Sequence, residues 1–398
     1  MANDFQYVVR QHYSEATEER LKKTLTAMDL AEMVDIPDGT TKNIPHVKMR
    51  ATGNYTKYTD QTITDVKTGN DTIVIDTTPM VNFAIDMLDE EDNYINVKPE
   101  VISDASYQIK QRIDGDFFNK VTDAKWKYDA NGFGVNAGTL SPITLATGAS
   151  QNISATFGKA KAGLTNSGVN GEKLVLAIDD NVAVDLATLG LEQGYNIADE
   201  SYTRGYVGRF WGLRTYQVST LTSTTVLDLA TNPTNGDYIY IKGVKFTFVS
   251  SIGTTAGNVL IGASADATAV NLIALITTPW TTTANGVALA DDDIAILEGV
   301  SAVDGTDLVT FTSKNGALLA SSSMTAAAND FRAQVLNATI MERGAIKMAF
   351  RGVKTDSRDE TKKLVTNYFI YARYGLKVTT RAKEKMCIIP LVSQAAES

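Results

Sequence analysis

The stretch PEVISDASYQIKQRIDGDFFNKVTDAKW, residues 99–126, decides the architecture that we expect for this chain. Pro99 falls in its first turn, where the missing N–H leaves no helical hydrogen bond unmade. Apolar residues recur at every fourth position along it, namely Val101, Ala105, Ile109, Ile113, Phe117 and Val121. The spacing predicts one long helix from residue 99 to about residue 126, with an apolar face about 40 Å long. We expect this helix to be the spine of the fold.

On the N-terminal side, residues 14–33 have the spacing of a surface helix. Residues 44–86 are rich in Thr, Val and Ile, which predicts a long two-stranded ribbon with strands at 54–66 and 72–85 and a turn at 68–71. Strands of about 13 residues would reach roughly 40 Å, and a solitary ribbon is marginal in water. We therefore expect the ribbon to lie on a neighbouring copy of the same chain.

The segments on the C-terminal side mix helical and strand patterns, which predicts an α+β fold. The Gly-rich segment 131–149 is expected to be a flexible loop. The other expected elements are a helix at 153–164, a buried strand at 173–178, a helix at 180–189, strands at 344–350 and 386–390, and a helix or strand at 363–374.

Residues 221–330 differ from the rest of the chain in composition. Thr and Ala make up about a third of them, and 3 basic against 10 acidic side chains give them about −7 of the net charge of −9. Residues 238–241 and 244–249 predict a hairpin with a two-residue loop, and residues 264–276 predict a helix. We expect an inserted domain that folds separately on the outer surface, with its two ends close together. The alternative is a large loop without its own core.

Composition also excludes several classes of protein. The single cysteine, Cys387, rules out an internal disulfide and a cysteine-based zinc site, and two histidines, His12 and His46, leave little for histidine catalysis. The excess of 46 acidic over 37 basic side chains argues against wrapping nucleic acid. No run approaches the roughly 18 apolar residues of a membrane span, and the N-terminus resembles no signal peptide, so a cytoplasm-like compartment is expected.

Motifs for catalysis or for cofactors are weak, and we expect no enzyme, no cofactor and no metal. Asp291, Asp292 and Asp293 with Glu298 could bind Ca²⁺, but they lack the EF-hand spacing, and an acidic helix N-terminus is favoured. For His12 and His46 an interface or solvated role is favoured. The three tryptophans are expected to be packing residues; they are Trp126, Trp211 and Trp280.

The order of several segments carries a family resemblance. After the arm and the β ribbon come YQIKQRIDGDFF (107–118), GEKLVLAIDDNVAVDL (171–186), GYVGRFWGLRTYQVS (205–219), RGAIKMAF (343–350) and YGLKVTTRAK (374–383). In this order they resemble tailed-bacteriophage major capsid proteins with the Hong Kong 97-like fold. The resemblance implies an N-terminal arm at 1–46, an extended β loop at 47–81, a peripheral domain at 82–126 and 376–398, an axial domain at 127–220 and 331–375, and a surface insertion domain at 221–330.

The resemblance implies a subunit that self-assembles, as hexamers and pentamers, into an icosahedral head shell around double-stranded DNA. Its partners would be further copies and a portal, with scaffold or decoration proteins as further candidates, and with no membrane and no sequence-specific DNA contact. Assembly would take place in the host cytoplasm, and the protein would reside in the virion.

Six residues are candidates for assembly: Tyr55, Lys57, Tyr58 and Lys67 in the extended loop, and Ile113 and Phe117 on the spine helix. Some relatives crosslink a loop Lys to an Asn of a neighbour, but exposed Lys on an extended strand more often prevents edge pairing. Two alternative functions stay open, an encapsulin-type compartment that packages enzymes, and a β-rich adhesin or carbohydrate-binding protein suggested by the Thr-rich insert.

Overall fold

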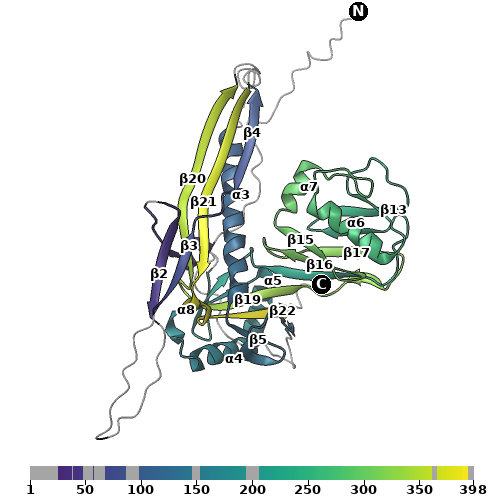
Figure 1. Ribbon diagram of the computed structural model, residues 1–398. Helices are drawn as coiled ribbons and strands as arrows, with labels where there is room; N and C mark the ends of the chain where they lie inside the picture. The colour runs from purple at the N-terminus through teal and green to yellow at the C-terminus, as the bar shows by residue number, and fades with distance from the viewer. Residues whose placement is uncertain are drawn as a thin grey trace, which may run out of the picture. The chain divides into compact units, whose positions relative to one another are not determined.

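The structure is a computed structural model (Figure 1). It describes residues 26–37, 39–47, 57, 68–86, 98–145, 153–193, 206–360 and 365–392. The chain divides into two compact units, each described here by itself. Within the described residues, the first unit holds parts of 78–110 and of 351–373, and the second holds the rest. Both contain helix and strand, as the expected α+β class requires.

The first unit contains β4 (Met80–Asp86), the first part of α3 (Lys98–Asn119) and most of β20 (Ile346–Glu360) and β21 (Val365–Val378). β21 pairs antiparallel with β4, and the rings of Tyr368 and Phe83 stack with their centroids 5.2 Å apart. Buried and half-buried residues alternate along most of β21, the period of two expected for a strand with one covered face. The segment that the sequence left open as helix or strand is therefore a strand.

The centre of the second unit is a twelve-stranded sheet. Its strand β19 (Val335–Glu342) pairs antiparallel with both β22 (Met386–Val392) and β8 (Leu174–Ile178). All residues of β8 and β22 are buried, as continuous apolar runs predict. Helices α4 (Ile153–Asn166) and α5 (Asp180–Gln193) contribute to the same hydrophobic core. The helix expected at 153–164 and the strand expected at 173–178 are confirmed.

The remaining strands of this sheet are β5 (Trp126–Asp129), β6 (Gly132–Val135), β7 (Ile143–Thr144), β9 (Tyr206–Phe210), β10 (Leu213–Gln217), β11 (Ser223–Leu229), β15 (Val300–Asp304), β16 (Leu308–Ser313) and β18 (Asn329–Phe331). The expectation of a loop throughout 131–149 is wrong at its start, because β5 and β6 form a hairpin there. Gly132 has a positive φ of 95°, which suits the turn, and Phe133 stacks on Trp126 at 5.4 Å.

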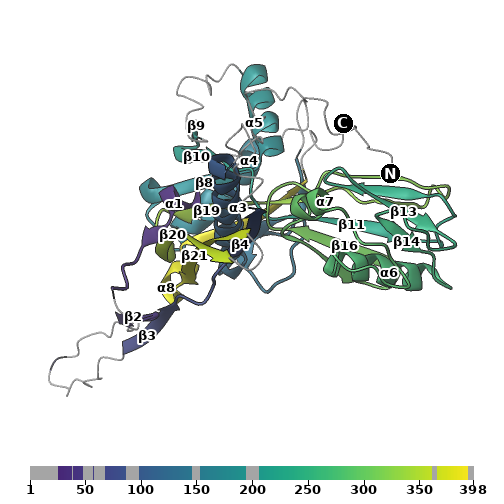
Figure 2. The ribbon, with the colours of Figure 1, turned by 90° about the horizontal axis from the view of Figure 1, so that it is seen from above.

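Residues 221–331 form what we call the β-rich lobe (Figure 2). A second, four-stranded sheet in it consists of β12 (Tyr238–Ile241), β13 (Val244–Val249), β14 (Asn258–Leu260) and β17 (Ala320–Ser323). The β12–β13 hairpin closes through Lys242 and Gly243 at φ 52° and 86°, the two positive values of a primed two-residue turn. Helix α6 (Ala265–Thr277) begins at Ser264, whose hydroxyl oxygen accepts a hydrogen bond from the Ala267 N–H at 3.1 Å.

The two ends of the lobe lie side by side. The outgoing strand β11 pairs antiparallel with β18, where Leu227 is opposite Phe331, and with the start of β19, where Ser223 is opposite Leu336. The expected proximity of the ends is thus confirmed, because the outgoing and returning strands are neighbours in one sheet. The lobe also has a hydrophobic cluster of its own, which includes Phe246, Leu272 and Phe311.

The spine helix, α3, starts where the sequence predicts but is shorter than expected. It ends at Asn119, and a 3₁₀ turn, η2 (Lys120–Asp123), leads into β5. The predicted end near residue 126 is wrong because Lys125 N–H donates to the Lys383 carbonyl at 2.9 Å, a tertiary contact that sequence spacing does not reveal. The apolar face is confirmed: Val101 is half-buried, and Ala105, Ile109, Ile113, Phe117 and Val121 are buried.

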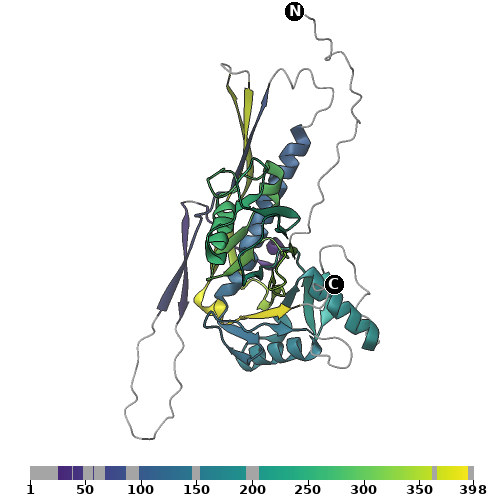
Figure 3. The same cartoon turned by 90° about the vertical axis from the view of Figure 1, so that its right-hand side faces the viewer.

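The β ribbon is built from other residues than predicted. β2 (Thr41–Val47) pairs antiparallel with β3 (Thr68–Val74) as a separate two-stranded sheet (Figure 3). The predicted strand at 54–66 lies outside the described residues, Lys57 apart. The predicted return strand at 72–85 is wrong, because it is divided between β3 and β4.

The turn predicted at 68–71 is also wrong, because these residues lie within β3. Thr-Gly-Asn-Asp has the composition of a turn, but Gly69 serves a packing need in the strand. A Cβ there would come within 2.4 Å of His46 Nε2, so the histidine ring occupies the space that a side chain would take.

The N-terminal helix predicted at 14–33 is confirmed only in part. Residues 14–25 lie outside the described residues, α1 spans Ala27–Leu30, and the strand β1 (Glu32–Met33) follows. β1 pairs parallel with the first residues of β20, and this pairing ends the helix earlier than its spacing predicts. The last helix, α8, spans Thr380–Lys383 and leads into β22.

Candidate functional site

The structure places the six candidate assembly residues in different ways. Tyr55, Tyr58 and Lys67 lie outside the described residues, and Lys57 is exposed in a turn. Ile113 and Phe117 are 1% and 0% exposed on the buried face of α3. These two are brought together by the helix, and any part of theirs in assembly would act through the position of that helix. An assembly role for all six stays a prediction.

One turn of α3, residues 112–117, is the first polar centre, and we call it the spine turn. Asp114 is 2% exposed, and its Oδ1 accepts hydrogen bonds from the N–H groups of Thr26 at 2.9 Å and Ala27 at 2.6 Å. Its Oδ2 accepts a hydrogen bond from the Thr220 hydroxyl. Burial raises the pKa of Asp114 to about 6, although these three hydrogen bonds lower it. This carboxyl group joins the start of α1, the spine helix and the entrance to the lobe.

The spine turn also receives the base of the lobe at Gly115. A Cβ on Gly115 would lie 2.3 Å from Asn315 Oδ1 and 2.6 Å from the Lys314 carbonyl oxygen. Ion pairs flank the contact, between Lys314 Nζ and Asp116 at 3.7 Å and between Arg112 and Glu298 at 3.8 Å. The glycine therefore permits a close approach of lobe backbone to the helix.

The second polar centre, which we call the ribbon base, fastens β2 and β3 to α8. The Asp71 carboxylate accepts hydrogen bonds from the Thr380 N–H at 3.0 Å and the Thr380 hydroxyl at 2.9 Å, and it lies 3.3 Å from His46 Nδ1. Arg381 donates to the Val47 carbonyl. Burial by itself raises the pKa of Asp71, but the Thr380 hydrogen bonds and the charges of His46 and Lys377 outweigh it, and the pKa is lowered.

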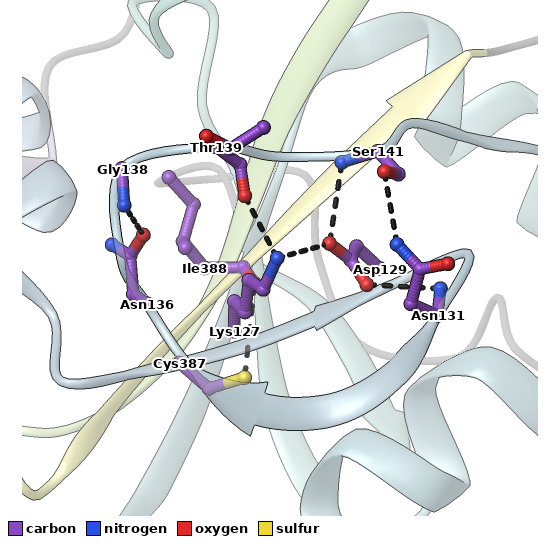
Figure 4. Close-up of polar contacts among 9 residues, drawn as sticks. All are labelled: Lys127, Asp129, Asn131, Asn136, Gly138, Thr139, Ser141, Cys387 and Ile388. Carbon is purple, nitrogen blue, oxygen red and sulfur yellow. Dashed lines mark hydrogen bonds and ion pairs between the residues drawn. The ribbon is translucent and has the colours of Figure 1, made fainter.

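A third carboxylate, Asp129, closes the loop after the β5–β6 hairpin (Figure 4). It pairs with Lys127 Nζ at 2.6 Å and accepts from the N–H groups of Asn131 at 2.9 Å and Ser141 at 3.2 Å. Lys127 Nζ also donates to the Thr139 carbonyl at 2.7 Å. Burial raises the pKa of Asp129, but the bonds from Lys127, Ser141 and Asn131 prevail and the pKa is lowered. The arrangement holds residues 139–141 against the hairpin.

These three carboxylates share a chemistry. Each accepts hydrogen bonds from backbone N–H groups of another segment, which is how a carboxylate anchors structure. In the part of the chain that the structure describes, no three His, Cys, Asp or Glu side chains gather as a metal-binding group. Asp291, Asp292 and Asp293 occupy the first turn of α7 (Asp291–Ile296), as the favoured helix N-terminus predicts.

Two further side chains bear on reactivity and packing. Cys387 is fully buried, and burial raises the pKa of its thiol well above the ordinary value, so it is protonated and inert. Trp126 packs as expected, but Trp211 and Trp280 are 54% and 67% exposed, so the packing expectation is wrong for these two. Trp211 instead lies at a turn, where its Nε1 donates to Ser154 Oγ at 3.1 Å. No helix among the described residues is long and apolar enough to cross a membrane.

Sequence reasoning missed both polar centres. The pair Asp114-Gly115 in the last third of the spine helix was the available signal, because both residues are poor helix formers and need a tertiary reason to be there. Asp71 and Thr380 are 309 residues apart in sequence, and no local pattern links them.

Comparison with known proteins gives its result at the level of structure. No family model matches the sequence, and no curated protein matches it. Among solved structures, a chain of Mycobacterium phage Che8 is similar over 97% of this chain and 98% of its own, with TM-score 0.50 and 10% identity. A chain from the capsid structure of the cyanophage P-SCSP1u is similar over 97% and 94%, with TM-score 0.51 and 10% identity.

A chain from the mature capsid of bacteriophage PhiM1 is similar over 96% of this chain and 91% of its own, with TM-score 0.51 and 10% identity. In each case the likeness extends through nearly the whole of both chains. The resemblance drawn from the order of sequence segments is thus confirmed in three dimensions, and the chain has the fold of phage capsid chains.

Proposed function

We propose that this chain is the major capsid protein of a tailed phage, which assembles as hexamers and pentamers into the icosahedral head shell around double-stranded DNA. The observation that carries this proposal is the likeness to the two chains from phage capsids over 96–97% of this chain and at least 91% of theirs. A shared module inside unrelated proteins would not extend through nearly the whole of both chains. The role is structural, without catalysis.

The proposed division of the chain into parts is the one that the resemblance implies. It comprises an N-terminal arm (1–46), an extended β loop (47–81), a peripheral domain (82–126 and 376–398), an axial domain (127–220 and 331–375) and a surface insertion domain (221–330). The two-stranded β2–β3 sheet supports an extended ribbon, because a ribbon with two open edges gains stability when a neighbouring copy lies against it. Of its strands, β3 lies in the proposed loop, whereas β2 lies almost wholly in the proposed arm. Many such contacts, each weak, stabilise a closed shell together.

The charge distribution supports an outward position for the lobe. Its 10 acidic and 3 basic side chains would repel DNA on an inner wall, whereas on the outside they would keep particles apart in solution. The rest of the chain is nearly neutral, which suits a wall that encloses DNA without binding it tightly. An antibody against the lobe should therefore bind intact particles, and binding only to opened particles would contradict this position.

The test of the proposal is assembly. The protein, expressed alone or with a scaffold, is examined by negative-stain electron microscopy beside a variant in which a short Gly-Ser linker replaces residues 48–67. This replacement keeps β2 and β3, so the folded subunit should survive while closed particles disappear. Tyr55→Ala with Tyr58→Ala is a milder companion. A wild-type protein that stays monomeric across concentration and salt would contradict the proposal.

The content of the particles distinguishes a phage capsid from the encapsulin-type alternative. Particles taken from infected cells should hold nuclease-resistant double-stranded DNA. Particles that hold protein cargo and no DNA would favour the compartment instead.

Separate folding of the lobe is tested by expressing residues 221–330 alone and recording the amide spectrum. The cluster around Phe246, Leu272 and Phe311 predicts dispersed signals. A collapsed spectrum would contradict an independent domain and would leave the capsid proposal standing.

A further inference from the structure

A groove of about 880 Å³ opens on the β-rich lobe beside the edge strand β17. One wall is formed by residues 318–322, and the other by residues 330–334. At one end the walls meet, where the Ser322 hydroxyl donates to Asp330 Oδ1 at 2.5 Å. None of the candidate assembly residues lines this groove.

The backbone of β17 has a free side that faces away from its partner. β17 ends the order β14-β13-β12-β17, and Lys242 N–H donates to the Leu319 carbonyl at 2.7 Å, so the backbone groups of Leu319 face β12. Because successive residues of a strand direct these groups to opposite sides, those of Ala320 and Ser322 point away from β12. Within the described residues, no backbone hydrogen bond reaches them from that side.

Side chains beside this free edge add two means of recognition. Leu319 is 69% exposed, and the half-buried Tyr240 lies in the same groove, so the two side chains offer apolar contact to an occupant. On the opposite wall, Nε2 of Gln334 is buried and has no hydrogen-bond partner among the described residues. An amide donor in that state suits a carbonyl group of an incoming backbone.

We propose that this groove binds an extended, positively charged segment of a partner protein, which adds to β17 as a fifth strand. Ala320 and Ser322 supply the backbone bonds, Leu319 and Tyr240 the apolar contact, and Gln334 a further donor. The sign of the charge follows from the lobe, whose 10 acidic side chains outnumber 3 basic ones, and from the exposed Asp330 at the rim. Arg332 lines the same wall, but it is paired with Asp228 at 2.8 Å, so the rim keeps the negative charge of Asp330. The inference concerns the folded subunit and does not depend on shell formation.

The experiment uses the full-length protein and a displayed library of random peptides of about twelve residues as the probe. Enriched peptides are synthesised, and their affinities for wild type, Ser322→Pro and Ser322→Ala are measured by fluorescence anisotropy. Proline removes the N–H that points into the groove while the pairing with β12 stays intact. Alanine removes the same hydroxyl contact to Asp330 but keeps the N–H, so it is the matched control.

We expect the enriched peptides to alternate apolar and polar residues and to carry net positive charge. Ser322→Pro should weaken their binding by roughly tenfold or more, and Ser322→Ala by less than about threefold. If Ser322→Pro fails to fold, Leu319→Ser at the exposed position should weaken binding in its place.

Three results would overturn the proposal: no enriched peptide, neutral or acidic peptides, or equal binding by Ser322→Pro and Ser322→Ala. A fourth such result could come from hydrogen exchange of the Ala320 and Ser322 amides, measured without peptide. Strong protection there would mean that another copy, or another part of this chain, already fills the groove. Particle formation by the same variants, observed separately, distinguishes failure of this inference from failure of the capsid proposal.

Discussion

The spine turn and the ribbon base differ in the surroundings of their central aspartates. Both use one aspartate to tie distant segments together, but Asp114 is 2% exposed and accepts its bonds from neutral donors only. Asp71 lies beside His46 and Lys377. The pKa of Asp114 is consequently raised to about 6, whereas that of Asp71 is lowered.

This difference means that the two joints respond to pH in opposite directions. A buried carboxyl group without a cation strains the fold whenever it is ionised, yet its removal leaves buried N–H groups unpaired. A half-buried carboxylate with cations nearby, such as Asp71, gives a modest gain that solvent and a fall in pH can withdraw. The spine turn should therefore weaken as pH rises through about 6, whereas the ribbon base should weaken as pH falls and is the place where the ribbon loosens.

The most severe way to break the spine turn is Ile113→Asp. It places an unpaired charge at a position that is 1% exposed, at a cost of several kcal/mol against a typical domain stability of about 5–15 kcal/mol. We expect insoluble or unassembled protein, judged by solubility and electron microscopy. Ile113→Val, which should cost about 1 kcal/mol, is the control. Normal particles from Ile113→Asp would show that the helix face is assigned wrongly.

Asp114→Ala should have the next largest effect on the free energy of unfolding. It leaves the N–H groups of Thr26 and Ala27, in residues that are 1% and 2% exposed, without an acceptor, which costs roughly 1–3 kcal/mol for each group. Asp114→Asn keeps an acceptor and removes the charge, so its unfolding free energy at pH 7 should equal or exceed that of wild type. Denaturant unfolding measures both, and equal losses in the two variants would refute an acceptor role.

The pH dependence of the same pair sharpens the comparison. Because the pKa of Asp114 rises from 3.8 to about 6 on folding, the native state holds its proton longer than the unfolded state. This contribution to stability is therefore largest below about pH 4, and as pH rises toward 6 the fold loses roughly 3 kcal/mol. The slope should disappear in Asp114→Asn, and a wild-type profile in that variant would assign the slope to other groups.

Gly115→Ala tests how the lobe rests on the spine turn. In an open helix this change would be favourable, but here the Cβ meets the Lys314 carbonyl at 2.6 Å, so the lobe must shift. We expect a loss of about 1–3 kcal/mol and faster proteolysis near residues 314–316. Lys110→Ala, at an exposed position of α3, is the control. Stabilisation by Gly115→Ala would mean that the lobe does not press on this turn.

The smallest effect is expected at the ribbon base. Asp71→Asn should leave the global melting temperature almost unchanged and speed amide exchange of β3 by about fivefold, a local loss near 1 kcal/mol. Since the pKa of Asp71 is lowered on folding, its contribution is present above its ordinary pKa and is lost as pH falls through the folded value. Asp35→Asn, with the same charge change on an exposed residue, is the control. Equal rates of amide exchange in both variants would show that Asp71 does not hold the ribbon base together.

The local sequence pattern predicted the structure correctly where buried residues recur with the period of a helix or a strand. The face of α3, the buried strand β8 and the β12–β13 turn all depend on residues within a few positions of one another. It failed in the ribbon, where the turn-like residues 68–71 lie in β3 because they pair with residues 44–47. Strand partners are a non-local choice, and Thr, Gly, Asn and Asp carry no signal for it.

By itself, the sequence determined the spine helix, the α+β class, the anomalous charge of residues 221–330 and the order of segments that resembles phage capsid proteins. Periodicity and composition are properties of neighbouring residues, so one chain is enough to read them. Only the tertiary structure decided that Asp114 meets Thr220 and that Asp71 meets Thr380, partners 106 and 309 residues away. The energy of a buried carboxyl group depends on which donors the whole fold brings to it, and no local stretch contains that information.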